Sequence, residues 1–517
     1  MNSTGASEVA SRRLVSNSRW NLLAFAVSLL VNFATIPIVI TAIGLPAFGA
    51  GGLVLAVYAP LMLVGTVLGQ AMVKELAPLL AAGPEQHGNA ASMFSTSLFL
   101  CVSGSILVAA CTTLLANVAV KALDADTASA VDWQLAFLVA ACGWGAQQVA
   151  LVLQAGIAAT QRFAALAQVG IVVALSSAAC VVAGAMWRPD HLGFLLGTSA
   201  GFLLALALWW RLVRRELPFL FPLARVNRQD IRLIMAFGKW QGGAHFVGAT
   251  GNQIDRYLLG VLAPLSVVGQ FNVAMRLQEV VHMGLLKATE VLLPHFAVTA
   301  SDSLERRGSF FAQASWVLNL LGACALAPLV PLAHSLIALW INEEAAQGGA
   351  QMLRTLAAAG ILGCGVNVYY YFALGTGQQA RMAILTTIHA LLTIAFTGIA
   401  LLTFGPMAAG AGYLAANLVR LAASLWLTRQ HFSIALALSR LLQSTLPPLF
   451  LGLAVAFALW HVGWFAPDTW WALLRDYALI ATMVALSASL VACASRPGRD
   501  LVIQCVLVLR QILLRRG

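Results

Sequence analysis

Residues 20–49 read WNLLAFAVSLLVNFATIPIVITAIGLPAFG, thirty residues without a charged side chain. A helix needs about 20 mostly apolar residues to cross the hydrocarbon core of a bilayer. Comparable windows follow one another along most of the chain, in which 60% of the 517 residues are hydrophobic and only 9% are charged. Backbone groups in hydrocarbon must hydrogen-bond within their own segment, so helices must do the spanning. The sequence therefore predicts an all-α, polytopic membrane protein.

Apolar windows of this kind predict about fourteen transmembrane helices. They cover roughly residues 20–43, 48–80, 93–120, 134–158, 165–187, 190–212, 237–262, 266–299, 310–340, 350–374, 382–403, 406–428, 442–462 and 469–494. With this count, most of the 30 Lys and Arg residues fall on alternate connections, and acidic residues gather on the others. Cytoplasmic loops are the ones enriched in Lys and Arg. Both termini are therefore predicted to be cytoplasmic, and the net charge of +11 follows from membrane topology without any nucleic-acid partner.

The opening stretch recurs once in the chain. Residues 240–269, WQGGAHFVGATGNQIDRYLLGVLAPLSVVG, align with residues 20–49 without a gap at an offset of 220. The matched pairs include Trp20 with Trp240, Asn32 with Asn252, and Gly49 with Gly269. Because six spans is an even number, each copy would start on the same side of the membrane, as parallel repeats do. The repeat predicts two pseudo-symmetric six-helix lobes around a central cavity, with two further helices at the C-terminus.

The resulting domain boundaries are expectations from span positions alone. An N-terminal lobe is expected over residues 1–212, an Arg-rich cytoplasmic connection over 213–236, a C-terminal lobe over 237–428, and the last two spans with a basic cytoplasmic tail over 429–517. The connections are too short to hold a soluble catalytic domain. A transporter that handles its substrate between two lobes by alternating access is therefore expected, and not an enzyme.

Several charged residues fall near the middle of predicted spans. An unpaired charge at the bilayer centre costs at least about 2.5 to 3.5 kcal/mol, so such residues normally face protein or water. The central cations are Arg256, Arg276, Lys287 and Arg420. At about 100° per residue, Asn272, Arg276, Glu279, Lys287 and Glu290 share one face of their span. The positions in the first lobe that match Asp255 and Arg256 are Thr35 and Ile36, so this charge belongs to the second lobe only.

Two interpretations of these charges stay open. They can form internal ion pairs that hold helices together, Arg276 with Glu279 and Lys287 with Glu290. Alternatively, the four cations bind an anionic substrate in a water-filled cavity, where a phosphate would suit Arg through paired hydrogen bonds. Polar residues that could line this cavity or couple transport to an ion are Asn32, Asn252, Asp255, Asn272, Glu279, His282 and Glu290. The three glutamines of the fourth span, Gln147, Gln148 and Gln154, could contact sugar or pack between helices.

Motifs for other chemistries are missing from the sequence. There is no G-x-x-x-x-G-K-[ST] phosphate loop, so the chain is not expected to bind ATP in this way. The eight cysteines are scattered singly and no His lies at ligand spacing from them, which predicts neither a metal site nor a cofactor. The energy for transport must then come from an ion gradient, from consumption of the substrate, or from a separate subunit.

Two segments carry a resemblance to a known family. They are residues 19–53, RWNLLAFAVSLLVNFATIPIVITAIGLPAFGAGGL, and residues 254–277, IDRYLLGVLAPLSVVGQFNVAMRL. Both resemble the polysaccharide-transport branch of the multidrug/oligosaccharidyl-lipid/polysaccharide exporter superfamily, within which the chain looks like an O-antigen or related lipid-linked oligosaccharide flippase. The pattern D-R-Y-x-L-G…G-x-[FY]-x-x-A runs here from Asp255 to Ala274.

The resemblance implies a function for the two lobes. It implies movement of an undecaprenyl-pyrophosphate-linked glycan between the leaflets of a bacterial cytoplasmic (inner) membrane, for O-antigen or exopolysaccharide biosynthesis. The implied partners are the lipid-linked glycan, membrane lipid, H⁺ or Na⁺ as a coupling ion, a polysaccharide polymerase and a chain-length regulator. Arg256, Arg276, Lys287 and Arg420 are the residues that could receive the pyrophosphate.

Three other classes compete with this interpretation. An ion-coupled drug or metabolite antiporter of the same superfamily would favour an acidic cavity, whereas cations dominate here. A membrane enzyme such as a polysaccharide polymerase would need a long outer loop with catalytic acids or histidines. A purely structural scaffold would have no need of a charged face in the middle of the bilayer.

Overall fold

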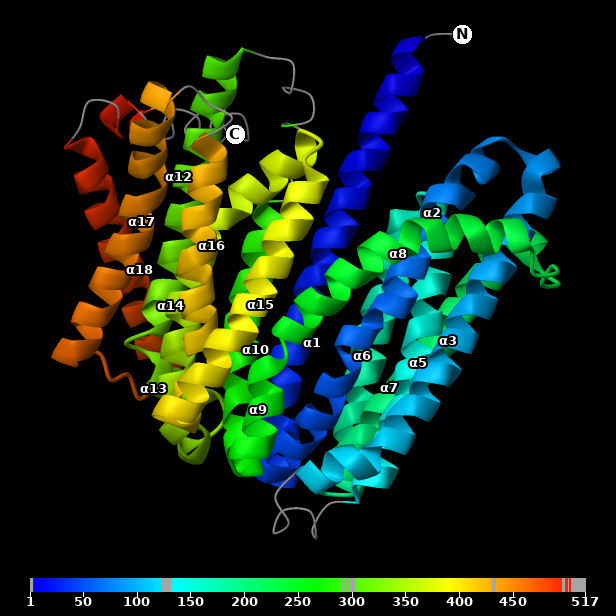
Figure 1. Ribbon diagram of the computed structural model, residues 1–517, viewed down its shortest axis with the longest axis horizontal. Coiled ribbons are helices and arrows are strands. Elements are labelled where there is room, and N and C mark those ends of the chain that lie inside the picture. Colours follow the sequence, from blue (N-terminus) through cyan, green and yellow to red (C-terminus); the bar gives the residue numbers. More distant parts are fainter. Residues whose placement is uncertain are drawn as a thin grey trace. The chain divides into compact units, whose positions relative to one another are not determined.

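The computed structural model describes residues 3–122, 132–289, 303–429 and 434–494, together with 292, 296, 498–500 and 502–503. Over these residues the chain is helical and contains no strand (Figure 1). Ten helical stretches within them are long and apolar enough to cross a membrane. The predicted all-α, polytopic membrane fold is confirmed.

The predicted count of about fourteen spans is approximate. One of the ten apolar stretches, Leu22–Ala81, joins the first two predicted spans. Three further predicted spans fall on helices outside the ten: α8 (Arg228–Gly251), α10 (Leu265–Thr289) and α16 (Ala411–Arg429). Charged side chains, such as those of the predicted polar face on α10, lower the hydropathy of these helices below that of a simple span.

The chain divides into two compact units. Unit 1 comprises Met1–Gln253 and Pro264–Gly269, and unit 2 comprises Ile254–Ala263 and Gln270–Gly517. The α-helices that the structure describes in unit 1 are α1 (Ser3–Tyr58), α2 (Leu63–Ala81), α3 (His87–Ala122), α5 (Trp133–Ala159), α6 (Phe163–Trp187), α7 (His191–Glu216) and α8. Those of unit 2 are α9 (Ile254–Leu262), most of α10, α12 (Leu304–Leu326), α13 (Ala333–Trp340), α14 (Glu343–Gly375), α15 (Gln379–Phe404), α16, α17 (Ile434–Val462) and α18 (Trp470–Cys493).

Glycines let the helices of unit 1 approach closely, and α6 and α7 lie side by side (Figure 1). A Cβ atom added to Gly184 on α6 would stand 2.7 Å from the Cα of Gly197 on α7. One turn further along, a Cβ on Gly201 would stand 3.0 Å from the Cα of Ser177. Small residues at such interfaces allow van der Waals packing between backbones, which is a main source of helix association in lipid. Gly197 and Gly201, four residues apart on one face of α7, thus allow α7 to pack closely against α6.

Helix α1 bends at a glycine and contacts the second copy of its own repeat. Gly44 has a φ of +78°, outside the helical region, and it falls between the first two predicted spans. Beyond the bend, a Cβ on Gly49 would overlap the carbonyl oxygen of Leu265, and a Cβ on Gly269 would overlap that of Leu45. These contacts lie within unit 1, which includes Pro264–Gly269. Of the two glycines matched by the repeat, Gly49 therefore packs against the segment that contains Gly269, and Gly269 packs against the segment that contains Gly49.

Several helices start at a capping side chain. The carboxylate of Asp190 accepts a hydrogen bond from the backbone N–H of Gly193 at 2.8 Å, at the start of α7, which satisfies one of the free N–H groups there. Burial by itself raises the pKa of Asp190, but the bond from Gly193 and the neighbouring Arg188 outweigh it and hold the pKa below its usual value. The capped start of α7 is thus favoured with Asp190 ionised, so this contribution to stability is present above the pKa of the unfolded chain and is lost as the pH falls through the folded value.

Helix α14 lies at the centre of unit 2 and packs against α12, α13, α16 and α17. Tyr369, Tyr371 and Phe372 on its C-terminal half join Phe296 and Phe311 in a buried aromatic cluster. Phe296 and Phe372 meet edge to face with ring centroids 5.4 Å apart. The two tyrosines are consequently part of the packing of unit 2.

The predicted span over residues 237–262 is not a single helix. Helix α8 ends at Gly251, and α9 begins at Ile254. Between them the backbone N–H of Asn252 bonds to Gly248 and that of Gln253 to Thr250, which tightens the end of α8 into a turn. The chain passes from unit 1 to unit 2 immediately after this turn. Asp255 and Arg256 therefore belong to a short helix of their own.

Candidate functional site

Helix α9 places two ionisable side chains inside unit 2. Asp255 is 1% exposed and Arg256 is 8% exposed, and they share the buried face of α9 with Leu259 and Gly260. A charge buried to this degree requires specific partners. The partners come from helices α10 and α16 and from the turn that precedes α16.

The carboxylate of Asp255 is held at one oxygen only. Its Oδ1 accepts a hydrogen bond from the backbone N–H of Gly410 at 2.9 Å. Gly410 has a φ of +90°, a conformation that favours glycine, and it precedes α16. The second oxygen, Oδ2, is buried without a hydrogen-bond partner among the described residues. Asp255 therefore fixes the turn before α16 and keeps one acceptor unused.

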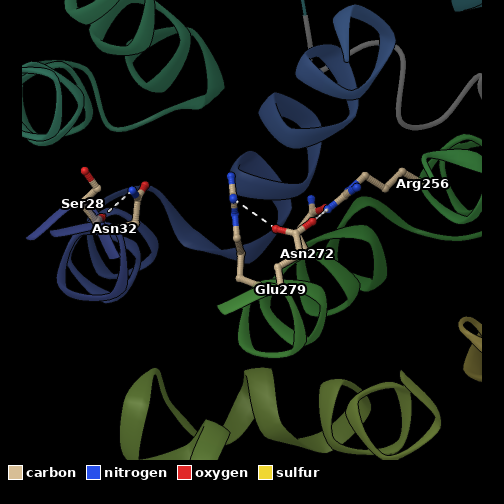
Figure 2. Close-up of polar contacts among 6 residues, drawn as sticks. Ser28, Asn32, Arg256, Asn272 and Glu279 are labelled. Atoms are coloured by element: carbon tan, nitrogen blue, oxygen red, sulfur yellow. Dashed lines mark hydrogen bonds and ion pairs between the residues drawn. The ribbon is translucent and has the colours of Figure 1, made fainter. Parts of the chain in front are cut away.

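The guanidinium of Arg256 is oriented by α10 (Figure 2). Its Nε donates to the side-chain oxygen of Asn272 at 2.6 Å, and its Nη2 lies 3.8 Å from a carboxylate oxygen of Glu279. The guanidinium carbon also lies 5.8 Å from the centre of the Phe271 ring, within the range of a cation–π contact. Three side chains of α10 thus contact the guanidinium group of Arg256 and fix its orientation.

A second arginine shares the same carboxylate. Nη1 of Arg276 lies 3.2 Å from Oε2 of Glu279, one turn along α10, and the side chain of Arg276 is 53% exposed. We call Arg256, Asn272, Arg276 and Glu279 the arginine cluster. The pairing of Arg276 with Glu279 is the internal ion pair that the sequence suggested. Within these four residues, two guanidinium groups share one carboxylate. The buried carboxylate of Asp255 also acts on Arg256.

A second, partly buried group of polar side chains includes residues of α16. Arg420 is close enough to His282 of α10 and His389 of α15 for its charge to act on both. His389 shares a hydrogen bond of 3.0 Å with the side-chain oxygen of Asn417, whose amide nitrogen donates to the carbonyl of Ala359 at 2.9 Å. Nε of Arg420 has no hydrogen-bond partner among the described residues. Arg420 and His282 are among the site residues predicted from the sequence, whereas His389 and Asn417 are not.

The remaining predicted site residues are spread over both units. In unit 2, Lys287 is exposed near the end of α10, and Glu290, its expected partner, lies outside the described residues. Asn252, which belongs to unit 1, is exposed in the turn between α8 and α9. In unit 1, Asn32 is exposed on α1 and its amide nitrogen donates to the carbonyl of Ser28 at 2.8 Å (Figure 2). Within unit 2 the structure thus groups Arg256, Asn272, Arg276 and Glu279.

Unit 1 contains a cavity of about 780 Å³ that includes Asn32. Helices α1, α2, α5, α6 and α7 line it, and its polar lining includes Ser28, Asn32, Thr66, Gln70, Lys74 and Gln154. The neighbouring glutamine of α5, Gln148, is fully buried and accepts a hydrogen bond from the backbone N–H of Gly65 at 2.9 Å. Of the two glutamines, Gln148 therefore packs between helices and Gln154 faces the cavity.

The described residues contain no group of three His, Cys, Asp or Glu side chains that could hold a metal ion. The ionisable groups of the arginine cluster and of the Arg420 region can instead bind and orient an anion. Two fixed guanidinium groups offer several N–H donors in planar geometry, which matches the oxygens of a phosphate.

Solved structures with a similar fold are transporters. Lipid II flippase MurJ in an inward closed conformation aligns over 94% of this chain and 100% of its own, with a TM-score of 0.69 and 12% identity. A multidrug resistance MATE family transporter in an inward-facing conformation aligns over 78% of this chain and 94% of its own, with a TM-score of 0.67 and 13% identity. A transporter from Pyrococcus furiosus, described as having a binding pocket of reverse polarity, aligns over 80% and 94%, with a TM-score of 0.54 and 13% identity.

These similarities define the class of fold: the chain is a multi-pass membrane protein with the fold of the multidrug/oligosaccharidyl-lipid/polysaccharide exporter superfamily. A search of curated protein sequences finds no match. The family model described as "Polysaccharide biosynthesis protein" matches residues 14–299, more than half of the chain. The chain belongs to this family.

Proposed function

We propose that the protein is a flippase that moves an undecaprenyl-pyrophosphate-linked oligosaccharide from the inner to the outer leaflet of the bacterial cytoplasmic membrane. Transport would occur by alternating access, with both termini in the cytoplasm, and would serve O-antigen or exopolysaccharide biosynthesis. A polysaccharide polymerase and a chain-length regulator would act on the same glycan afterwards. Membership of the polysaccharide biosynthesis family supports this substrate class.

The observation that carries the proposal is the arginine cluster. Arg256 and Arg276 share the carboxylate of Glu279, and the guanidinium of Arg276 has N–H donors left for an anion. Arg256 is fixed by Asn272, whereas the exposed Arg276 is accessible to a ligand. A pyrophosphate carries the charge and the acceptor oxygens that such a pair binds best. The proposed roles of Lys287 and Arg420 as further cations rest on their charge and on their place on α10 and α16.

Replacing Arg276 or Lys287 by alanine is expected to abolish display of the glycan at the cell surface while the protein stays in the membrane. Each change removes a cation that the pyrophosphate would meet. Surface glycan is measured by labelling intact cells, and protein abundance by blotting the membrane fraction. Arg381→Ala, which removes an exposed cation at the start of α15, serves as the control and should leave display unchanged. Normal display in both the Arg276 and the Lys287 variant would contradict the proposal.

Asp255 is the proposed coupling residue for H⁺ or Na⁺. Its buried Oδ2 has no hydrogen-bond partner among the described residues, so a proton or cation could be accepted there without displacing the bond to Gly410. Asp255→Asn keeps an oxygen for Gly410 and removes the charge. We expect this variant, reconstituted in liposomes, to translocate substrate at a rate that no longer responds to an imposed ion gradient. An unchanged response would remove Asp255 from the coupling mechanism.

The alternative function is an ion-coupled drug or metabolite antiporter of the same superfamily. The multidrug transporters that share the fold favour it. The two functions differ in the charge of the ligand. Binding of a cationic dye such as rhodamine to the purified protein, without binding of undecaprenyl pyrophosphate, would support the antiporter.

A further inference from the structure

The cavity of unit 1 has a lining unlike the arginine cluster. Helices α1, α2 and α5 contribute neutral hydrogen-bonding side chains, among them Ser28, Asn32, Gln70 and Gln154. Helix α6 contributes apolar side chains such as Leu166 and Val173. A volume of about 780 Å³ lies within the range of about 300 to 1,000 Å³ that is usual for small-molecule sites. The cavity thus combines neutral polar groups and apolar surface, as a ligand with both kinds of surface requires.

The charge of the cavity does not favour an anion. Lys74 is the charged residue of its lining, and the ammonium group lies 3.1 Å from the carboxylate of Glu75. An ammonium paired in this way has little net attraction left for a second anion. A pyrophosphate would therefore gain much less here than at Arg256 and Arg276 in unit 2.

The neutral side chains have hydrogen-bonding capacity to offer. Gln70 and Gln154 form no side-chain hydrogen bond to any residue that the structure describes. Asn32 uses its amide nitrogen for the carbonyl of Ser28, which leaves the side-chain oxygen as an acceptor facing the cavity. Each glutamine presents two donors and an acceptor. Together these amides can exchange hydrogen bonds with several hydroxyl groups.

The helices that carry these amides are held at a fixed separation. A Cβ on Gly65 of α2 would stand 2.7 Å from the carbonyl oxygen of Gln148 on α5. A Cβ on Gly69, four residues on, would stand 3.1 Å from the Cβ of Ala155. This close packing fixes Gln70 next to Gly69 and Gln154 next to Ala155 on rigid elements. The ligand therefore meets polar groups that are already in place, which lowers the entropy cost of binding.

We infer that unit 1 contains a second ligand site, which binds an uncharged sugar of the lipid-linked glycan. A pyranose ring has hydroxyl groups at its edge for Asn32, Gln70 and Gln154, and apolar C–H faces for Leu166 and Val173. The inference rests on the proposed flippase function and deepens it, because it names a neutral sugar as the part of the substrate that unit 1 binds. Recognition of the sugar is then separate from recognition of the lipid anchor.

Gly170 offers a way to fill the cavity without disturbing the helices. It belongs to the lining on α6, and a Cβ added there meets no atom within 4 Å. The Gly170→Leu variant should therefore fold, and its leucine side chain should fill the part of the cavity in which the sugar would bind. Gly398 of α15 also meets nothing within 4 Å and lies outside the cavity, so Gly398→Leu is the matched control. Gln154→Met keeps the shape of its side chain and removes the amide.

The full-length protein is purified in a detergent without a sugar headgroup, and its affinity is measured for undecaprenyl pyrophosphate with and without a neutral oligosaccharide. We expect the sugar to strengthen binding about tenfold in the wild type and the Gly398 variant, which corresponds to about 1.4 kcal/mol. In Gly170→Leu this gain should disappear while the bare lipid binds as before, and Gln154→Met should lose part of it. An equal gain in wild type and Gly170→Leu, or no gain in the wild type, would overturn the sugar site and leave the flippase function standing.

Failure of the wild type to bind either lipid would instead overturn the flippase function. A neutral alkyl maltoside with a photoreactive group then tests the cavity by itself, because it carries no phosphate. Crosslinks to peptides of α5 and α6 that are lost in Gly170→Leu would support a sugar site in a protein with another substrate. Equal labelling of wild type and variant would overturn it.

Discussion

Replacing Arg256 by alanine is expected to abolish translocation and to weaken binding of undecaprenyl pyrophosphate by at least a hundredfold. The side chain is buried, and its Nε and Nη2 hold Asn272 and Glu279 in place. Its loss would remove a cation and leave the buried amide oxygen of Asn272 without its donor, which costs about 1 to 3 kcal/mol. Glu279 would keep its ion pair with Arg276. Affinity for the lipid and transport in liposomes are the measurements.

Replacing Arg256 by lysine tests the positive charge separately from the planar geometry of the guanidinium group. Arg256→Lys keeps the positive charge but cannot donate to Asn272 and face a phosphate at once, because an ammonium lacks the planar fork of a guanidinium. We expect partial recovery of protein stability and little recovery of transport. Binding of undecaprenyl pyrophosphate at wild-type strength by a correctly folded Arg256→Ala protein would disprove the role of this residue.

Alanine at Gly49 or Gly269 is expected to remove most folded protein from the membrane. A Cβ at either position would overlap a backbone carbonyl, and the Cβ at Gly49 would also stand 2.9 Å from the backbone nitrogen of Gly269. Backbone atoms cannot rotate away as a side chain can, so the helices must separate. Overpacking of this kind costs about 1 to 3 kcal/mol and occasionally more. Thermal stability of the purified variants, followed by fluorescence-detected size exclusion, is the measurement.

Glycines in open space supply the controls for this prediction. Gly170→Ala and Gly398→Ala add the same methyl group where nothing lies within 4 Å, and in a helix alanine is favoured over glycine by about 1 kcal/mol. Both should be as stable as the wild type or more so. The double variant at Gly49 and Gly269 should be less destabilised than the two single effects combined, because either methyl group already separates the same segments. Equal stability of the alanine variants at Gly49, Gly269, Gly170 and Gly398 would show that the contact between the segments of Gly49 and Gly269 does not contribute to stability.

The sequence was most informative where a pattern extends over many residues. The long apolar windows predict the helical membrane fold, and the bend of α1 at Gly44 falls between two predicted spans. The repeat paired Gly49 with Gly269, but could not show that their segments touch, because a periodic match contains no distances. Similarly, the charge of Arg256 was visible as an exception in an apolar run, whereas its contact with Asn272 depends on how α9 packs on α10.

Local breaks and single polar residues were harder to predict. The predicted span over residues 237–262 assumed one continuous helix, and the turn at Asn252 interrupts it, so residues on either side of the turn do not follow one helical periodicity. His389 and Asn417 are lone polar residues in two apolar spans, and only the packing of α15 on α16 brings them together. Gln70 and Gln154 became distinguishable from packing residues such as Gln148 only through the cavity they line.

The chain crosses between its two units three times within a short distance, after Gln253, after Ala263 and after Gly269. A ribosome that has made only the first 253 residues has therefore not yet supplied the segment Pro264–Gly269, on which Leu45 and Gly49 pack. Domains made first usually fold first during synthesis. Here unit 1 cannot complete its packing until Pro264–Gly269 has been made, and this segment comes after the first segment of unit 2. A truncated or stalled chain would therefore leave the glycine face of α1 uncovered. Separate expression of the two halves, divided at Gln253, would carry the same defect.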